Sequence, residues 1–207
     1  MNAAVLTVSD GVSHGTREDR SGDLLAEALA GEGFVVERRV VPDEQEAIAA
    51  AIAALALGNA LVLTTGGTGF TPRDVTPEAT RPLLDREAPG IAEAIRADAL
   101  TRTPHALLSR GLAGLRGATL VVNLPGSPGG CRDGFAVLQP ALVHGLQLAA
   151  GDQGSRHVQT RARRPCLCHA DSSRSSSSST RSSHSRSRTT AHFSPSTATR
   201  ARRRSSG

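Results

Sequence analysis

Short apolar runs recur along the first 151 residues and alternate with longer segments in which apolar and polar positions are mixed. A short apolar run is typical of a buried strand, because a strand of a parallel sheet is covered by helices on both faces. The second run alternates between apolar and charged positions along part of its length. The runs predict strands at residues 3–9, 34–41, 60–63 and 119–124.

The segments between these strands predict helices, because their apolar residues return every three or four positions and form one face. Three helices have clear inward-facing residues: Leu24, Leu25, Ala28 and Leu29 in the first, Ile48, Ile52 and Leu55 in the second, Ile91, Ala94 and Ile95 in one over 89–100. Asp43 is a candidate N-cap for the second helix. Further helices are predicted over 77–87 and over 133–149, where Pro140 interrupts the pattern. Residues 105–117 are compatible with helix or with extended chain.

Strand and helix therefore alternate from the start of the chain. This order predicts an α/β fold, a three-layer sandwich with a mostly parallel central sheet. Ligands of such sheets bind beyond the carboxyl ends of the strands. All four predicted strands end in polar, acidic or glycine-bearing residues, namely Ser9-Asp10, Pro42-Asp43, Thr64 to Gly69 and Asn123 to Ser127. If the strands are parallel these ends meet at one edge, which favours a binding site over four unrelated turns.

The most informative of these ends is the loop after the third strand, Thr64-Thr65-Gly66-Gly67-Thr68-Gly69. Its glycines permit a tight turn and a close approach of the backbone to a ligand. It matches neither a Walker A loop nor a dinucleotide-binding fingerprint. Backbone amides and threonine hydroxyls suit an anion, although a purely structural tight turn remains an alternative.

The residues that follow this loop add charge and a helix start. Arg73 and Asp74 supply a cation and a carboxylate, which a phosphate group and its metal ion require. Thr76 is predicted as the N-cap of the next helix, with Pro77 at its first position.

The charge divides the chain in two. Residues 1–151 contain 12 Arg and 17 acidic residues, whereas residues 152–207 contain 12 Arg and 2 acidic residues, so the overall charge of +5 arises from the second part. Residues 152–207 are rich in Ser and Arg and contain little apolar surface to offset the entropy of ordering. We therefore predict a folded domain over 1–151 and a disordered low-complexity tail over 152–207.

The location follows from what the chain lacks. No apolar run approaches the roughly 20 residues of a membrane helix. The N-terminus enters a strand without a basic leader, so a cytoplasmic protein without membrane association is expected. Cys131 in the folded part and Cys166 and Cys168 in the tail do not form a disulfide framework.

The tail has several possible interpretations. Its arginines could bind RNA or membrane lipid electrostatically, and Cys166, Cys168 and His169 could form part of a metal site, although three ligands in four residues are a weak signal. A shifted reading frame in a GC-rich gene would produce the same kind of Arg- and Ser-rich sequence. Nucleic acid is accordingly expected only through the tail, if at all.

The combination of motifs resembles one family. The matching segments, in order, are Ser9-Asp10, Asp19-Arg20-Ser21-Gly22, Pro42-Asp43-Glu44-Gln45, Thr64 to Gly69, Arg73 to Thr80, Ser109-Arg110 and Asn123 to Pro128. Over about residues 3–150 the chain is similar to the MogA/MoaB family of molybdopterin adenylyltransferases. The resemblance implies transfer of AMP from ATP to the terminal phosphate of molybdopterin, with release of pyrophosphate and assistance by Mg²⁺. It also implies a homotrimer, with hand-over of the product to a molybdenum-insertion protein.

The resemblance also assigns roles to residues. It makes Asp43 and Asp74 the catalytic acids that hold the metal and orient the phosphates, and it places Ser9 and Asp10 near the nucleotide. The loop residues Thr64, Thr65, Gly66, Gly67, Thr68 and Gly69 would grip the pterin dithiolene and its phosphate. Arg73 and Ser127 are further candidates for phosphate binding. Simpler interpretations are a helix cap for Asp43 and Ser127, and ordinary loop side chains for Asp74 and Arg73.

One departure from the family lies beside this site. Many relatives carry Arg after the Ser-Asp pair, where this chain has Gly11, so a charge contact there is absent or replaced. A non-catalytic molybdopterin-binding or carrier module is the alternative function. The presence of both Asp43 and Asp74 favours the enzyme.

Overall fold

Six strands form one mixed sheet in the order β2-β1-β3-β6-β5-β4 in a computed structural model that describes residues 1–151. Four strands are mutually parallel: β1 (Asn2–Val8), β2 (Val35–Val41), β3 (Leu61–Thr65) and β6 (Thr119–Leu124). β5 (Ala113–Arg116) is antiparallel to β6, and β4 (Arg86–Glu87) is antiparallel to β5. The predicted fold class and the four predicted strands are confirmed. The predicted tail lies outside the described residues.

The central strands are apolar because both of their faces are covered. Leu63 of β3 pairs with Val5 of β1 on one side and with Val122 of β6 on the other, and all three are almost fully buried. β2 is an edge strand and accommodates the charged run Glu37–Arg39. Charged residues on an exposed edge oppose pairing with another strand.

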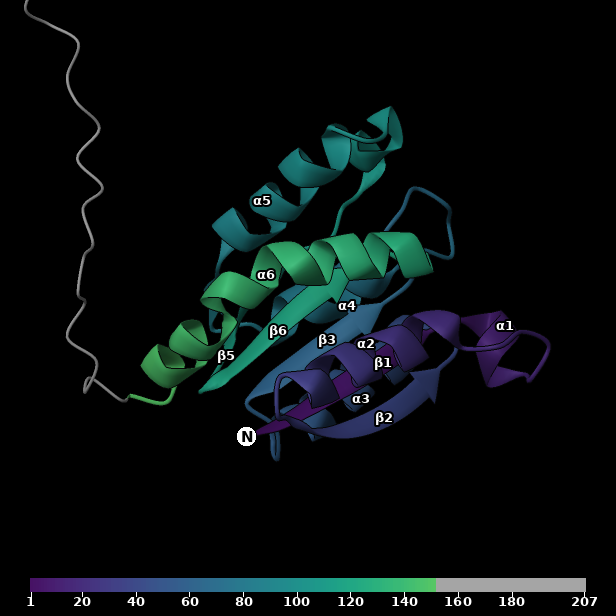
Figure 1. Ribbon diagram of the computed structural model, residues 1–207. Coiled ribbons are helices and arrows are strands. Elements are labelled where there is room, and N and C mark those ends of the chain that lie inside the picture. Colours follow the sequence, from purple (N-terminus) through teal and green to yellow (C-terminus); the bar gives the residue numbers. More distant parts are fainter. Residues whose placement is uncertain (152–207) are drawn as a thin grey trace, which may run out of the picture. The chain divides into compact units, whose positions relative to one another are not determined.

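Helices cover both faces of this sheet and make the three layers (Figure 1). α2 (Arg20–Gly31), α5 (Pro89–Leu100) and α6 (Pro128–Ala149) lie over one face, and α3 (Gln45–Ala56) and α4 (Thr76–Thr80) over the other. Adjacent residues of one strand serve different layers, since Leu63 joins the α2–α6 core and Val62 the α3–α4 core.

Several predicted helix boundaries were wrong. The helix predicted over 77–87 stops at Thr80 and is followed by a 3₁₀ turn, η1 (Arg81–Leu83), because Pro82 has no N–H to continue the ladder. The last helix begins at Pro128 instead of Asp133, and it continues through Pro140. On α5 the buried alanine is Ala92, whereas the predicted Ala94 is exposed.

The ambiguous segment 105–117 combines both of its possible structures. It begins within a 3₁₀ turn, η2 (Pro104–Leu108), and continues into β5. A tight turn at Gly117, whose φ is +56°, then joins β5 to β6. This turn lies at the amino edge of the parallel strands, because β6 begins at Thr119 and ends at Leu124.

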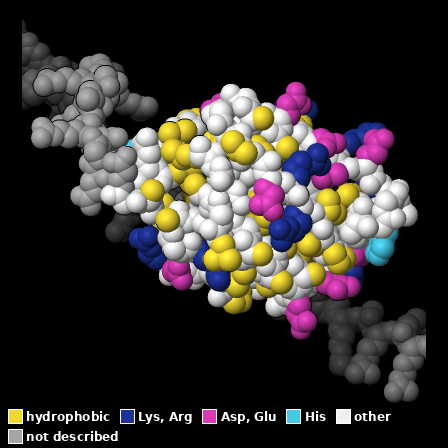
Figure 2. Space-filling model, turned by 90° about the horizontal axis from the view of Figure 1, so that it is seen from below, with side chains coloured by type: hydrophobic (Ala, Val, Ile, Leu, Met, Phe, Trp, Pro, Cys, Tyr) yellow, Lys and Arg dark blue, Asp and Glu magenta, His cyan; other side chains and the backbone are white. Residues whose placement is uncertain are grey.

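The surface of the described residues is mixed in character. In Figure 2 apolar side chains lie in small groups between charged ones on the face that is shown. Within residues 1–151, no helix combines the length and the hydropathy that crossing a membrane demands.

Candidate functional site

The carboxyl ends of the four parallel strands meet at one edge, as predicted, and hydrogen bonds join them in pairs. The Ser9 N–H after β1 donates to the Val41 carbonyl of β2 at 3.0 Å, and the Gly66 N–H after β3 donates to the Leu124 carbonyl of β6 at 3.4 Å. Residues more than a hundred positions apart also meet here, because the Ser21 hydroxyl donates to the Gly126 carbonyl at 2.8 Å. The chain therefore brings its polar strand ends together.

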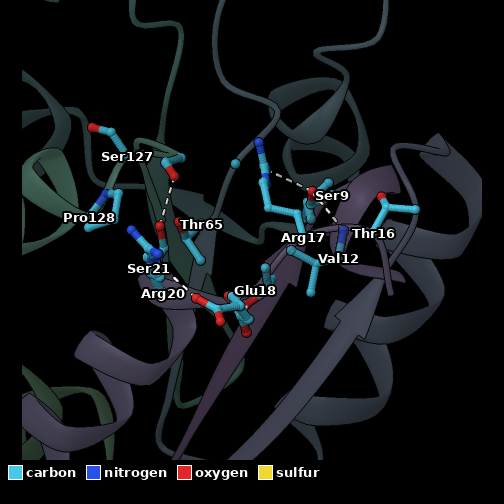
Figure 3. Close-up of a pocket in the computed structure, with 15 residues that line it drawn as sticks. Ser9, Val12, Thr16, Arg17, Glu18, Arg20, Ser21, Thr65, Ser127 and Pro128 are labelled. Carbon is cyan, nitrogen blue, oxygen red and sulfur yellow. Dashed lines mark hydrogen bonds and ion pairs between the residues drawn. The ribbon is translucent and has the colours of Figure 1, made fainter. Parts of the chain in front are cut away.

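A cavity of about 660 Å³ opens at this edge (Figure 3). Ser21, Ser127 and Pro128 lie on one side of it, and Ser9, Val12, Thr16 and Arg17 on the other. Its lining residues come from the ends of β1, β3 and β6 and from the loop before α2: Thr7, Val8, Ser9, Val12, Thr16, Arg17, Glu18, Asp19, Arg20, Ser21, Thr65, Gly66, Gly126, Ser127 and Pro128. Four predicted site residues line it directly, namely Ser9, Thr65, Gly66 and Ser127.

Glycine is required at two positions of the loop after β3. Gly66 and Gly67 have φ values of +101° and +62°, in the region that side chains rarely adopt. A Cβ on Gly66 would lie 2.2 Å from the Val8 carbonyl oxygen, and one on Gly67 would lie 2.4 Å from the Thr76 Oγ1. The loop therefore lies directly against β1 and the start of α4.

The threonines of the loop are all buried but differ in role. The Thr65 hydroxyl borders the cavity, donates to the Pro125 carbonyl at 2.9 Å and lies 3.1 Å from the Cys131 Sγ. Thr64 is fully buried and its hydroxyl accepts the Asn123 side-chain amide at 2.9 Å, so its side chain is sealed from the cavity. Thr68 is also buried, and its carbonyl accepts the Arg110 N–H at 2.9 Å.

Thr76 fixes the far end of the loop, but not as the predicted N-cap. The N-cap of α4 is Val75, and Thr76 is the first helical residue. The Thr76 hydroxyl donates to the Gly66 carbonyl at 2.9 Å, and the Thr76 N–H donates to the Gly67 carbonyl at 3.0 Å. Its hydroxyl therefore stabilises the glycine turn instead of the helix end.

The two predicted catalytic acids flank this loop. A Cβ on Gly67 would lie 3.4 Å from the Asp43 Oδ1, and one on Gly69 would lie 3.1 Å from the Asp74 Oδ2. Asp43 does not cap α3 as predicted, because the N-cap is Glu44 and no side chain caps that helix. The Asp43 Oδ2 accepts the Asp10 N–H at 2.8 Å, and the Asp74 Oδ2 accepts the Thr71 N–H at 2.7 Å. Both carboxylates are therefore oriented by backbone amides.

Asp10 and Arg73 form a direct link between β1 and the loop after β3. The Arg73 guanidinium donates to the Asp10 Oδ2 at 2.6 Å through Nη2 and at 3.2 Å through Nε. The Asp43 N–H, which donates to the Asp10 Oδ1, and this guanidinium hold the pKa of the Asp10 carboxyl below its ordinary value. The predicted phosphate contact of Arg73 thus competes with an ion pair.

Ser127 caps α6 at the mouth of the cavity. Its hydroxyl accepts the Gly130 N–H at 3.1 Å, which confirms the simpler interpretation of this residue. Ser127 is exposed and the long helix α6 presents its amino end here, which favours an anion. Capping and anion binding are compatible at this position.

Arg110 holds the loop from outside the cavity. Its Nε donates to the Gly69 carbonyl at 2.7 Å, and its two terminal nitrogens contact the Asp74 carbonyl and the Glu78 carboxylate. These contacts hold the backbone at Gly69 and at Asp74, whose carboxylate is a predicted metal ligand. The Ser109-Arg110 motif indicated a family likeness, but its spacing alone gave no role.

The loop before α2 forms one wall of the cavity, although its Asp19-Arg20-Ser21-Gly22 segment was expected only as a family motif without a role in the site. Asp19 caps α2 by accepting the Gly22 N–H at 2.9 Å, and it also accepts the Thr7 hydroxyl at 2.8 Å. Arg17 lines the same cavity and donates to the Ser9 hydroxyl at 2.9 Å. The available signal was Asp19 at the start of a helix, because Asp is a preferred N-cap residue and this helix begins at the carboxyl edge of a parallel sheet.

The acids suit a magnesium ion that is shared with phosphate ligands. No group of three or more acidic, His or Cys side chains within residues 1–151 is arranged to hold a metal alone. Mg²⁺ usually takes one or two carboxylates together with substrate phosphates and water. Asp43 and Asp74 match that mode. Within residues 1–151 each accepts its hydrogen bond through Oδ2, which leaves Oδ1 for a metal ion.

Comparison with known proteins identifies the described part of the chain. The family profile described as "Probable molybdopterin binding domain" matches residues 4–144. Gephyrin of Dictyostelium discoideum is 46% identical over 156 residues, which are 70% of this chain but 22% of that protein. The molybdopterin adenylyltransferase of Escherichia coli K12 is 37% identical over 155 residues, which are 70% of this chain and 80% of that protein.

The solved structures agree with these relatives. The crystal structure of the molybdopterin biosynthesis enzyme MoaB from Thermus thermophilus has a TM-score of 0.69 and 49% identity, and the match covers 72% of this chain and 96% of that one. The chain spans less than half the length of several curated relatives that it matches, including gephyrin, but most of the length of the bacterial adenylyltransferase.

Proposed function

The chain belongs to the MogA/MoaB family of molybdenum cofactor biosynthesis, and from this premise we propose that it transfers AMP from ATP to the terminal phosphate of molybdopterin. The products are adenylyl-molybdopterin and pyrophosphate. Relatives named molybdopterin adenylyltransferase support the nucleotidyltransferase class. The observation that carries the proposal is the position of Asp43 beside Gly67 and of Asp74 beside Gly69, in the loop that begins at the cavity with Gly66.

The reaction joins two anions, so its barrier depends on positioning and on neutralisation of charge. A phosphate oxygen of molybdopterin attacks the α-phosphorus of ATP, and the bond between the α-phosphorus and the bridging oxygen breaks as pyrophosphate leaves. No protein nucleophile is needed. Mg²⁺, when bound to Asp43 and Asp74, would supply positive charge to the reacting phosphates.

The rest of the site would bind and orient the two reactants. The glycine loop brings backbone amides close to a ligand, and Ser127 and the start of α6 offer a dipole and amides to a phosphate. Arg110 holds the loop rigid through the Gly69 and Asp74 carbonyls. This arrangement limits the motion of Asp74. A residue that binds a metal ion has to be held in place in this way.

Two further expectations belong to this proposal. We expect a homotrimer, and we expect the product to pass to a molybdenum-insertion protein. Relatives named molybdenum cofactor biosynthesis bifunctional protein, of which this chain spans about half, support a link to a further activity. Sedimentation of the full chain at several concentrations measures the first expectation directly.

The decisive test is formation of adenylyl-molybdopterin from ATP and molybdopterin with and without Mg²⁺. Asp74→Asn and Asp43→Asn should each lower the rate by about 100-fold or more, because a metal ligand and its charge are lost. Asp85→Asn is the matched control, since Asp85 also accepts a backbone amide, that of Gly117 at 2.6 Å, but at the opposite edge of the sheet. Tight binding of molybdopterin by the wild-type chain without any adenylylated product would instead establish the carrier module.

A further inference from the structure

Arg17 differs from the other charged residues of the cavity because no carboxylate within residues 1–151 pairs with it. Glu18 pairs with Arg20 at 3.2 Å, and Asp19 pairs with Arg38 at 2.9 Å. Both acids that line the cavity are therefore neutralised. Among the described residues, the Arg17 guanidinium has one side-chain partner, the neutral hydroxyl of Ser9 at 2.9 Å.

The backbone around Arg17 is fixed, so the position of this cation is built into the loop. The Gly11 carbonyl accepts the Thr16 N–H, the Thr16 hydroxyl and the Arg17 N–H, at 2.9, 2.9 and 3.0 Å. Gly11 lies directly beside the Arg17 side chain. A Cβ at Gly11 would lie at ordinary contact distance, 3.5 Å from the Arg17 Cβ and 3.9 Å from its Nε.

Ser9 holds the other end of this side chain. Ser9 is buried, with a relative exposure of 6%, and its hydroxyl also accepts the Val12 N–H at 3.3 Å. Because two donors already point at the Ser9 oxygen, its acceptor capacity is used inside the protein. Ser9 thus orients the guanidinium of Arg17, a residue that lines the cavity (Figure 3).

We propose that Arg17 is a phosphate-binding residue of this cavity and that Ser9 is its positioning residue. The inference rests on the proposed function, because the bound anion is a phosphate of one of its two reactants. A guanidinium offers several donors in a planar fork that matches phosphate oxygens. Across the cavity stand Ser127 and the amino end of α6, so an anion between the two walls would meet positive potential from both.

Binding without turnover tests this assignment. Calorimetric titrations of the full chain with ATP alone, and separately with molybdopterin alone, measure the affinity for each source of phosphate. Arg17→Ala should weaken one of the two affinities by about 10- to 100-fold, the range of a charge-assisted hydrogen bond, and Arg17→Lys should weaken it less. Arg39→Ala is the matched control, since Arg39 is paired with Glu37 at 3.0 Å on the edge strand β2.

A double-mutant cycle separates the two roles. Ser9→Ala should weaken the same affinity, and adding it to Arg17→Ala should cause no further loss, because Ser9 acts through Arg17. Thermal unfolding of each variant shows whether the fold is retained. Unchanged affinities for both reactants in a folded Arg17→Ala variant would overturn the inference, as would a Ser9 effect that persists in full without Arg17.

A failure of the Arg17 assignment can be distinguished from a failure of the proposed function. If the wild-type chain shows Arg17-dependent phosphate binding but forms no adenylylated product, the adenylyltransferase proposal fails and the role of Arg17 stands. If the wild-type chain is active and Arg17→Ala matches it in affinity and KM for both reactants, the proposed role of Arg17 is wrong and the proposed function stands.

Discussion

Asp10 and Asp43 exchange hydrogen bonds across two strand ends: the N–H of each donates to the carboxylate of the other, at 2.8 and 3.0 Å. The pair ties the end of β1 to the end of β2, and Arg73 adds the loop after β3 through its contact with Asp10. One predicted catalytic acid is therefore oriented by a neighbour that is itself held by a cation. The Asp43 backbone N–H in turn depends on the Asp10 carboxylate for its hydrogen-bond partner.

This dependence predicts a loss of stability in acid. The folded pKa of Asp10 lies below its ordinary value, because the Asp43 N–H and Arg73 favour the carboxylate. The stabilising contribution is fully present above about pH 4, the unfolded value, and it is lost as the pH falls through the lower folded value. Urea unfolding of wild type and Asp10→Asn should therefore differ at pH 7, and the difference should shrink below about pH 4. Glu93→Gln, on the exposed face of α5, should show no such trend; a constant wild-type advantage down to pH 2 would contradict the prediction.

Gly66→Ala should destabilise the protein and abolish binding at the glycine loop. The added methyl group would meet the Val8 carbonyl at 2.2 Å, and the φ of +101° is itself strained for alanine. We expect a loss in the free energy of unfolding of about 2 kcal/mol or more, measured by chemical denaturation. Gly117→Ala separates strain from collision, because Gly117 has a φ of +56° but no atom within 4 Å of an added Cβ. It should cost only about 1 kcal/mol. Equal losses in the two variants would show that the contact with Val8 is unimportant.

Arg110→Gln should reduce turnover more than it reduces stability. The substitution removes the contacts to the Gly69 and Asp74 carbonyls, so the loop between them gains freedom and Asp74 loses its fixed position. Steady-state kinetics should show a fall in kcat of about 10-fold or more, because misplacement of a catalytic group is costly. Arg116→Gln is the comparison, since Arg116 also donates to a carbonyl, that of Leu83 at 3.1 Å, away from the cavity. Similar kinetics for both variants would remove the positioning role of Arg110.

Cys131 should resist alkylation in the folded protein. The thiol is fully buried beneath Thr65, and this burial raises its pKa, so little of the reactive thiolate is present near neutral pH. In a Cys166→Ser/Cys168→Ser background, mass spectrometry should find Cys131 unmodified by iodoacetamide in buffer and modified in urea. Rapid labelling of the folded protein at pH 7 would show that the floor of the cavity opens.

The parallel half of the fold could be predicted because burial on both faces leaves a simple pattern. β1, β3 and β6 are continuous apolar runs for this reason, and their order along the chain placed the polar ends at one edge. β4 and β5 had no such pattern. β4 is two residues long, and β5 exists because Ala113 and Leu115 pair with Val122 and Leu120 of β6, which is a tertiary effect.

The roles of individual site residues were harder to predict than their place. An aspartate before a helix is normally interpreted as a cap, and Asp43 differs because its partner, Asp10, lies 33 residues earlier. Arg17 lies in a polar loop, and no local pattern indicates that its guanidinium reaches Ser9. Thr64 belongs to a glycine-rich motif, yet its hydroxyl is buried and accepts a hydrogen bond from the Asn123 side-chain amide. Each of these outcomes depends on contacts between distant parts of the chain.

The reversal of direction between β5 and β6 has a practical use. The Gly117 turn is at the end of the sheet remote from Asp43, Asp74 and the cavity, and a Cβ there would meet open space. A reporter dye or a surface tether joined at this turn would leave the entrance used by phosphorylated compounds unobstructed. The Gly117 turn is therefore a suitable position at which to attach a label for single-molecule or immobilised-protein measurements.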